Sequence, residues 1–269
     1  MHPILLQVGP IAIRFYGLMY VAALLMGIWL LRTEAERRGL LPERMVDLAF
    51  YVFVGGLIGG RLYYVLFKWG YYGAHPWKIL AVWEGGMAIH GGLIGGVIGA
   101  WWFARATGLS LGTLCDMLAP AASLGHAFGR FGNFMNGDAH GYPLHFPLLP
   151  AWLRHGPDWL GLTFPASSIA GREFGPVPLH PVMLYELVLN LLGFVWLWRW
   201  RTKPWPPGTL FGVYLMYYAV VRSFTSLFRA DDLYLGPFRL PHVVSGVMLC
   251  LGVWLCCAPR SRTTVAAER

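Results

Sequence analysis

The chain has 269 residues, of which 57% are hydrophobic and only 13% are charged, whereas roughly 25% of residues are charged in soluble domains. This composition excludes a water-soluble globule and is typical of a protein with several membrane spans. The formal net charge of +8 comes from basic residues between apolar windows, so we interpret it as a signal of orientation. No basic domain is present, and nucleic acid is not an expected partner.

Seven windows of about 18 to 22 mostly apolar residues predict membrane-spanning helices. In chain order they cover residues 14–31, 47–67, 87–104, 111–128, 182–198, 209–228 and 240–257. The fourth window is the weakest because polar residues such as Asp116 and His126 dilute it. Without a linker or an internal repeat, the sequence predicts one all-α polytopic membrane domain over residues 1–269.

Glycines at three- and four-residue spacing mark the second and third windows, within residues 55–60 and 85–99. Small residues at this spacing let helix backbones approach closely, so we predict that most of these glycines serve helix packing. Among the charged residues of the windows, we expect Arg61 to pair with Asp116 or Glu186, while Arg14 reaches the outer membrane surface.

The distribution of Lys and Arg predicts the orientation of the chain. Basic residues lie in segments 32–44 and 199–203, at Arg105 and in the C-terminal tail. If these segments are cytoplasmic, the N-terminus is outside and the C-terminus inside. In a bacterium this is a multi-pass protein of the inner (cytoplasmic) membrane. Residues 131–180 would then form an extracytoplasmic cap or arm between the fourth and fifth spans, and a loop of this length usually has a function.

The most informative motif is GHAFGRFGNFMNGDAHG, at residues 125–141. Arg130, Asn133 and Asn136 recur every three residues, so in a helix they share one face. The glycines that we expect to leave the backbone open to a ligand are Gly129, Gly132 and Gly137. The combination predicts an anion pocket at the depth of the lipid headgroups.

Two later arginines, Arg222 and Arg229, are seven residues apart, so we predict that they share one helix face. With Arg130 they would form a cationic cluster, and the planar guanidinium group suits phosphate. Three uncompensated guanidinium groups would be costly in a membrane, and a phospholipid headgroup would supply the missing anion.

His90 precedes Gly91 and Gly92 near the outer end of the third window. It is either a packing residue or a proton acceptor, whose ordinary pKa near 6.5 suits work around neutral pH. The histidines and the four cysteines lack the spacing of a metal site, and nucleotide-binding loops are missing. We therefore expect neither a metal nor a cofactor.

Several motifs together resemble the bacterial prolipoprotein diacylglyceryl transferases. They are YGLMY at residues 16–20, EGGMAIHGG at 84–92, GRFGNFMNGDAHG at 129–141, HPVMLYE at 180–186 and the late arginines. The resemblance implies a seven-span inner-membrane enzyme. Such an enzyme moves the diacylglyceryl group of phosphatidylglycerol to the lipobox cysteine of a prolipoprotein, forming a thioether and releasing glycerol 1-phosphate.

The resemblance also implies roles for individual residues. It assigns phosphatidylglycerol binding to Arg130, and other essential positions of the family match Tyr16, His90, Asn133, Gly141 and Arg222. The residue chemistry agrees, because His90 could take the thiol proton while Arg130 and Arg222 stabilise the leaving phosphate. Our assignment of catalytic residues is His90, Arg222 and Tyr16, and of lipid-binding residues Arg130, Asn133, Asn136, Asp138, Gly141 and Arg229.

Two positions depart from the family pattern. Ser226 stands where glutamate is common, which weakens the assignment of an acidic partner to Arg222, and Asp138 replaces a longer glutamate. These departures keep open a divergent paralogue that binds lipid or prolipoprotein with weak or altered activity. A lipid or solute transporter is the rival from another class, but transporters usually have related halves and sites near the midplane.

Overall fold

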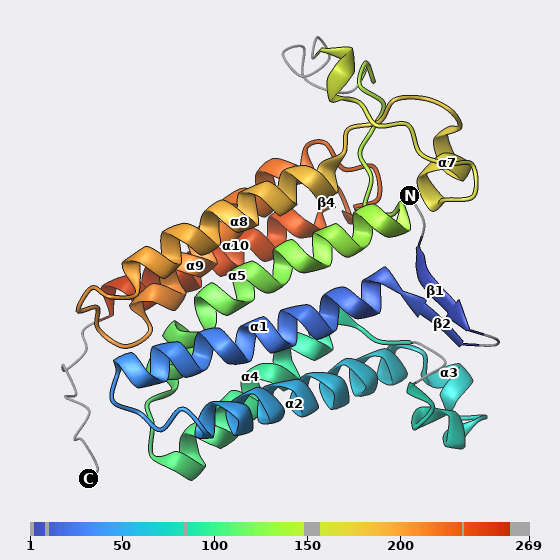
Figure 1. Ribbon diagram of the computed structural model, residues 1–269. Coiled ribbons are helices and arrows are strands. Elements are labelled where there is room, and N and C mark those ends of the chain that lie inside the picture. The colour runs from blue at the N-terminus through green and yellow to red at the C-terminus, as the bar shows by residue number, and fades with distance from the viewer. Residues whose placement is uncertain (1–2, 9–10, 83–85, 148–156, 233, 259–269) are drawn as a thin grey trace. The chain divides into compact units, whose positions relative to one another are not determined.

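The computed structural model describes residues 3–8, 11–82, 86–147, 157–232 and 234–258. These residues are mostly helical (Figure 1). They fall into two compact units: the first joins residues up to 27 to residues from 118 onward, and the second runs from 28 to 117. The candidate site residues lie in the first unit, except His90, which belongs to the second.

The elements follow one another along the chain as β1 (Ile4–Val8), β2 (Ile11–Arg14), α1 (Phe15–Arg37), α2 (Arg44–Phe67), α3 (Trp69–Tyr72), η1 (Pro76–Ile79), α4 (Ile89–Thr107), α5 (Leu111–Asn136), η3 (Asp158–Leu160), α7 (Ile169–Phe174), α8 (Val182–Trp200), α9 (Thr209–Ser226), β3 (Tyr234–Leu235), β4 (Phe238–Arg239) and α10 (Leu240–Cys257). Each of the seven apolar windows lies mainly within one helix. In the described part of the chain, α1, α2, α8 and α10 are long and apolar enough to cross a membrane. The chain is therefore a multi-pass membrane protein, and seven spans stay a prediction.

The prediction of an all-α fold is wrong in one respect, because two small antiparallel sheets are present. Strand β1 pairs with β2, and β3 pairs with β4. The first sheet precedes α1, so Arg14 ends a strand instead of beginning a helix. The sequence carries the reason, because the isoleucines and valine of these two strands favour extended backbone.

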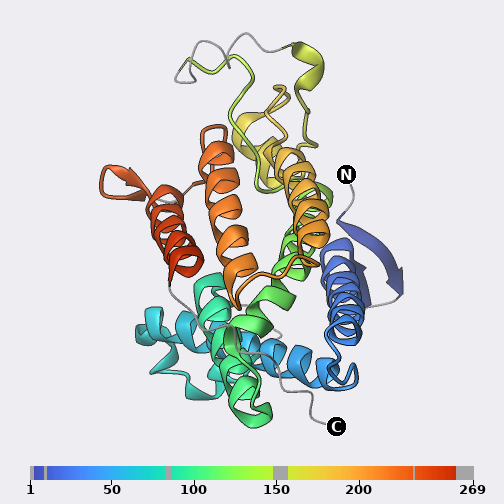
Figure 2. The same ribbon diagram turned by 90° about the vertical axis from the view of Figure 1, so that its left-hand side faces the viewer.

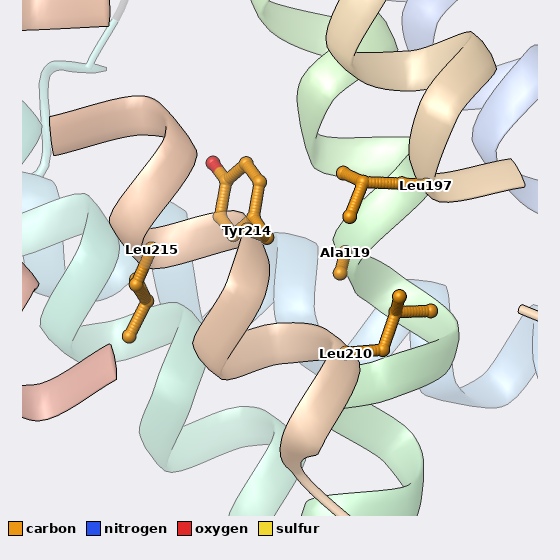
Figure 3. Close-up of a cluster of buried hydrophobic side chains, with 5 residues drawn as sticks. All are labelled: Ala119, Leu197, Leu210, Tyr214 and Leu215. Carbon is orange, nitrogen blue, oxygen red and sulfur yellow. The ribbon is translucent and has the colours of Figure 1, made fainter. Parts of the chain in front are cut away.

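In the first unit, α9 packs between α8 and α10 (Figure 2). Its side chains form a buried hydrophobic cluster with residues of α5 and α8 (Figure 3), which consists of Ala119, Leu197, Leu210, Tyr214 and Leu215. The backbones of α9 and α10 approach each other closely. A Cβ added to Gly252 of α10 would lie 2.6 Å from the carbonyl oxygen of Gly212 in α9. This packing fixes α8 and α9, which carry two of the charged residues described below.

In the second unit, α2 and α4 pack against each other through their glycines, which confirms the predicted role of these residues in helix packing. A Cβ added to Gly95 would lie 2.0 Å from the carbonyl oxygen of Gly55, and one added to Gly91 would lie 2.3 Å from that of Gly59. No side chain fits between backbones at these distances. The glycine spacing is therefore a packing device that holds α4, the helix whose second residue is His90.

Arg61 is buried in α2 and binds the segment that leads to α4. Its guanidinium group donates hydrogen bonds to the backbone carbonyls of Ile79 at 2.8 Å, Gly86 at 2.9 Å, Lys78 at 2.6 Å and Ala81 at 3.1 Å. We expected an ion pair with Asp116 or Glu186, whereas these contacts are to carbonyl oxygens. Arg61 therefore holds residues 78–81 and Gly86 against α2.

Candidate functional site

The motif at residues 125–141 continues a helix. Helix α5 ends at Asn136, two turns beyond the predicted span, so the loop begins at Gly137 and not at residue 131. Gly137 has a φ of +69°, the left-handed conformation that commonly ends a helix. Arg130 and Asn133 share a helix face as predicted, since Nη1 of Arg130 donates to Oδ1 of Asn133 at 3.1 Å.

Asp138 joins the two amides of the motif. Nδ2 of Asn133 donates to Oδ1 of Asp138 at 2.7 Å, and Nδ2 of Asn136 lies 3.3 Å from Oδ2. With the bond from Arg130 to Asn133, these contacts form a chain from guanidinium to carboxylate. An aspartate is therefore long enough to hold both amides here.

Glu186, in the second turn of α8, is the centre of the cationic cluster. Its side chain is 2% exposed and contacts three guanidinium groups. Nε of Arg130 contacts Oε2, while Nη1 of Arg222 lies 3.4 Å and Nη1 of Arg229 3.6 Å from Oε1. The Thr225 hydroxyl donates to the same Oε1 at 2.9 Å. One buried carboxylate thus gathers arginines from α5, from α9 and from the segment after α9.

Two further carboxylates complete the cluster. The side chain of Asp232 is 2% exposed, and its Oδ1 accepts from Nη2 of Arg222 at 2.6 Å while its Oδ2 accepts from the Ser226 hydroxyl. Asp231 is 33% exposed and binds Arg229 with both oxygens, Nε to Oδ1 at 2.9 Å and Nη2 to Oδ2 at 2.8 Å. Arg222 therefore has two acidic partners, Glu186 and Asp232, although position 226 is a serine.

These contacts correct the expectation of three uncompensated guanidinium groups. Arg130, Arg222 and Arg229 carry three positive charges, and Glu186, Asp231 and Asp232 carry three negative ones. The cluster is therefore neutral without any added anion. The buried carboxylates hold the arginines in place, which is what a preformed binding site requires.

The prediction that Arg222 and Arg229 share one helix face is wrong. Helix α9 ends at Ser226, with Leu227 as its C-cap, so Arg229 lies beyond the helix. Seven-residue spacing therefore does not align the two side chains. They meet because both reach Glu186 and Asp232.

Tyr16 lies beside the motif of α5. A Cβ added to Gly132 would lie 2.7 Å from Cδ2 of Tyr16, so the tyrosine ring covers this glycine. The hydroxyl of Tyr16 accepts a hydrogen bond from Tyr20 at 3.3 Å. The expectation that Gly132 exposes its backbone to a ligand is wrong, and so is that for Gly137, which faces Ser168. At Gly129 the space is open within 4 Å.

Gly141 lies where three segments meet. Its backbone N–H donates to the carbonyl of His180 at 3.0 Å, and it forms an isolated antiparallel bridge with Arg229. An added Cβ would lie 2.7 Å from the carbonyl oxygens of both His180 and Phe228. The absence of a side chain lets the backbone at Gly141 contact the segment that carries Arg229. Lipid binding by Gly141 stays a prediction.

His90 is the second residue of α4, and its side chain lies outside the described part of the structure. Its role as a base stays a prediction. A different histidine, His140, was missed by the sequence analysis: it is buried, and its Nε2 lies 3.1 Å from Oε2 of Glu173 in α7. Within the described residues, His, Cys, Asp and Glu side chains form no group of three that could hold a metal ion.

The arrangement is suited to a phosphate ester. Three arginines converge on Glu186 near the beginning of α8, and α8 begins at the end of the first unit where α5 ends (Figure 1). Guanidinium groups bind phosphate oxygens in pairs, and those held by buried carboxylates need little reorganisation when the ligand arrives. The amides of Asn133 and Asn136 add neutral polar groups to the same helix end.

Comparison with known proteins gives consistent results. Residues 3–258 match the family model of prolipoprotein diacylglyceryl transferase. A protein of Fusobacterium nucleatum is 40% identical over 94% of this chain and 96% of its own length. A protein of Geobacillus kaustophilus is 42% identical over 96% of this chain and 93% of its own length. A protein of Trichormus variabilis is 38% identical over 93% of this chain and 87% of its own length. Each relative is named phosphatidylglycerol-prolipoprotein diacylglyceryl transferase.

Proposed function

This chain belongs to the prolipoprotein diacylglyceryl transferase family, and we propose that its three clustered arginines bind the phosphate of the lipid substrate. The chain is an enzyme that transfers a diacylglyceryl group from phosphatidylglycerol to a prolipoprotein. The observation that carries the assignment of the site is the convergence of Arg130, Arg222 and Arg229 on Glu186.

In the proposed reaction, the lipobox cysteine gives its proton to a base and becomes a thiolate. A free thiol has a pKa near 8.5, so a base increases the reactive fraction at neutral pH. The thiolate sulfur attacks the carbon of the diacylated glycerol that is bonded to the phosphate oxygen. A carbon–sulfur bond forms as the carbon–oxygen bond breaks, and the electron pair of the broken bond leaves with glycerol 1-phosphate. We assign the base to His90.

Negative charge grows on the leaving phosphate as the carbon–oxygen bond breaks. Arg130 and Arg222 are held by Glu186 and Asp232, so they can stabilise this charge without moving. Asn133, tied to both Arg130 and Asp138, orients the headgroup by hydrogen bonds. Tyr16 supports the same helix end from α1.

We place this site at the outer face of the bacterial inner membrane. The proposal has seven spans, the N-terminus outside and the C-terminus in the cytoplasm, which agrees with the positions of Lys and Arg. Residues 137–180 then form an extracytoplasmic cap. This side is the one on which a translocated prolipoprotein presents its cysteine.

A complementation experiment tests the proposed site. The full chain is expressed in a strain depleted of its own transferase, as wild type and as Arg130→Ala, with the exposed Arg32→Ala as a charge-matched control. We expect growth with the wild type and the control, and none with Arg130→Ala at equal expression. Growth supported equally by Arg130→Ala would refute the assignment of the arginine cluster. Failure of a well-expressed wild type would favour a divergent paralogue.

A further inference from the structure

Asp231 and Asp232 are neighbours in sequence but differ in their surroundings. The side chain of Asp232 is 2% exposed and joins Arg222 to Ser226, whereas the side chain of Asp231 is 33% exposed. The side chain of Asp231 covers the Nε and Nη2 groups of Arg229, at 2.9 and 2.8 Å. Asp231 is thus the accessible carboxylate of the cluster.

The contact between Asp231 and Arg229 has the geometry that a phosphate would use. Two parallel N–H groups of one guanidinium reach two oxygens of one anion, which is the paired arrangement common to carboxylates and phosphates. Arg229 has other counter-ions, since Nη1 lies 3.6 Å from Glu186 and Nε 3.5 Å from Asp232. If Asp231 rotates away, Arg229 therefore keeps its two buried partners.

The charge of the site changes when Asp231 leaves. Three arginines and three carboxylates give a net charge of 3 − 3 = 0, and without Asp231 the sum is 3 − 2 = +1. A phosphodiester carries one negative charge and would restore neutrality. Glu186 and Asp232 are both 2% exposed and bind other members of the cluster, so neither could be displaced as easily.

We propose that Asp231 occupies the phosphate-binding groups of Arg229 in the free enzyme and is displaced by the phosphate of the lipid. After transfer, Asp231 competes with glycerol 1-phosphate for the same groups and promotes its release. The inference rests on the proposed function, because it requires that Arg229 binds the phosphate. Asp231 then sets the affinity for substrate and product without touching the reacting atoms.

Steady-state kinetics of the full chain in phosphatidylglycerol-containing micelles test this inference. Asp231→Asn keeps the size of the side chain but removes its charge, so we expect the KM for phosphatidylglycerol to fall about two- to fivefold. Inhibition by added glycerol 1-phosphate should become stronger by a similar factor. Asp231→Glu restores a carboxylate and should behave like the wild type. Glu36→Gln removes an exposed carboxylate in α1 and should also leave both constants unchanged.

A second variant and a binding measurement keep the test decisive. Asp231→Ala should shift both constants in the same direction, and titration of glycerol 1-phosphate into the enzyme without peptide should show tighter binding to both variants. An unchanged or raised KM in either variant, with an active wild type, would overturn the inference alone. A wild type that transfers nothing would instead overturn the proposed function.

Discussion

At the beginning of α8, one buried carboxylate faces three guanidinium groups. Glu186 is 2% exposed and contacts Arg130, Arg222 and Arg229, which come from different parts of the chain. A buried charge is costly unless it is paired, and here one negative group is a counter-ion of all three positive ones. Glu186 is therefore expected to position the arginines as well as to stabilise the fold.

Replacement of Glu186 by glutamine tests this dual role. Because the variant leaves three arginines around a neutral amide, we expect the free energy of unfolding to fall by about 3 kcal/mol and transfer activity to be lost. Denaturant unfolding in detergent gives the free energy. The control Glu43→Gln alters an exposed side chain without a capping hydrogen bond, and its effect should stay below about 0.5 kcal/mol. Equal stability of the two variants would refute the role of Glu186.

The local spacing in the sequence predicted one part of the site and missed another. Arg130 and Asn133 share a face because both belong to one helix, which periodicity can reveal. Arg229 reaches Glu186 from outside α9, so its place depends on tertiary structure. Asp231 lies only two residues after Arg229 in the sequence, and this proximity could have indicated that the two side chains form an ion pair.

At the scale of helices, the glycines of α2 and α4 offer a sharp comparison. A Cβ added to Gly95 would lie 2.0 Å from the carbonyl oxygen of Gly55. A Cβ added to Gly96 would lie 3.6 Å from its nearest neighbour, Cγ1 of Val52. Alanine favours a helix over glycine by about 1 kcal/mol at either position. The packing contact alone therefore distinguishes the two substitutions.

We expect Gly95→Ala to force α2 and α4 apart and to lower the free energy of unfolding by about 1 to 3 kcal/mol. Gly96→Ala should leave it unchanged or raise it slightly, since the added methyl group has room. Thermal unfolding of both purified variants in the same detergent provides the comparison. A destabilised Gly96→Ala beside an unaffected Gly95→Ala would contradict this account of the helix contact.

His180, two residues before α8, gives the fold a dependence on pH. Its Nδ1 lies 3.2 Å from the Tyr185 hydroxyl, and burial lowers the pKa of His180 from its usual 6.5. In the unfolded chain the imidazole binds a proton near pH 6.5, while in the folded chain it stays neutral to lower pH. Its contribution to stability is therefore complete above that pH and falls as the pH decreases below it.

His180→Asn removes this titration. As the pH falls below about 6.5, the free energy of unfolding should decrease more steeply for the wild type than for the variant. Denaturant titrations at several pH values in detergent measure both slopes, and the other histidines are common to both proteins. Parallel slopes for wild type and variant would show that His180 does not titrate as its burial predicts.

Helix boundaries were predicted less well than helix positions. The apolar window ends at residue 128 because glycines and polar residues follow it, yet α5 continues to Asn136. Hydrogen bonds among Arg130, Asn133 and Asp138 support the last turns of the helix, and a hydropathy window does not record such bonds. Strands β1 and β2 have 5 and 4 residues, so they are too short to stand out as apolar windows of about 20 residues.

At the scale of the whole molecule, the orientation in the membrane is the prediction that places the site. In a variant without native cysteines, we introduce Ser167→Cys in the cap and Thr202→Cys after α8, both at exposed positions. A membrane-impermeant maleimide should label Ser167→Cys in intact spheroplasts and Thr202→Cys only after lysis. The opposite labelling pattern would reverse the orientation and move the site to the cytoplasmic face.

Transfer by the purified full chain is the most direct test of the account. The protein is reconstituted with phosphatidylglycerol and a lipobox peptide, and mass spectrometry detects the modified peptide and glycerol 1-phosphate. We expect the wild type to form the thioether, and Arg130→Ala to be at least about 100-fold slower. A peptide with serine in place of the lipobox cysteine should remain unmodified. Equal rates for the wild type and Arg130→Ala, or no transfer by a folded wild type, would contradict the account.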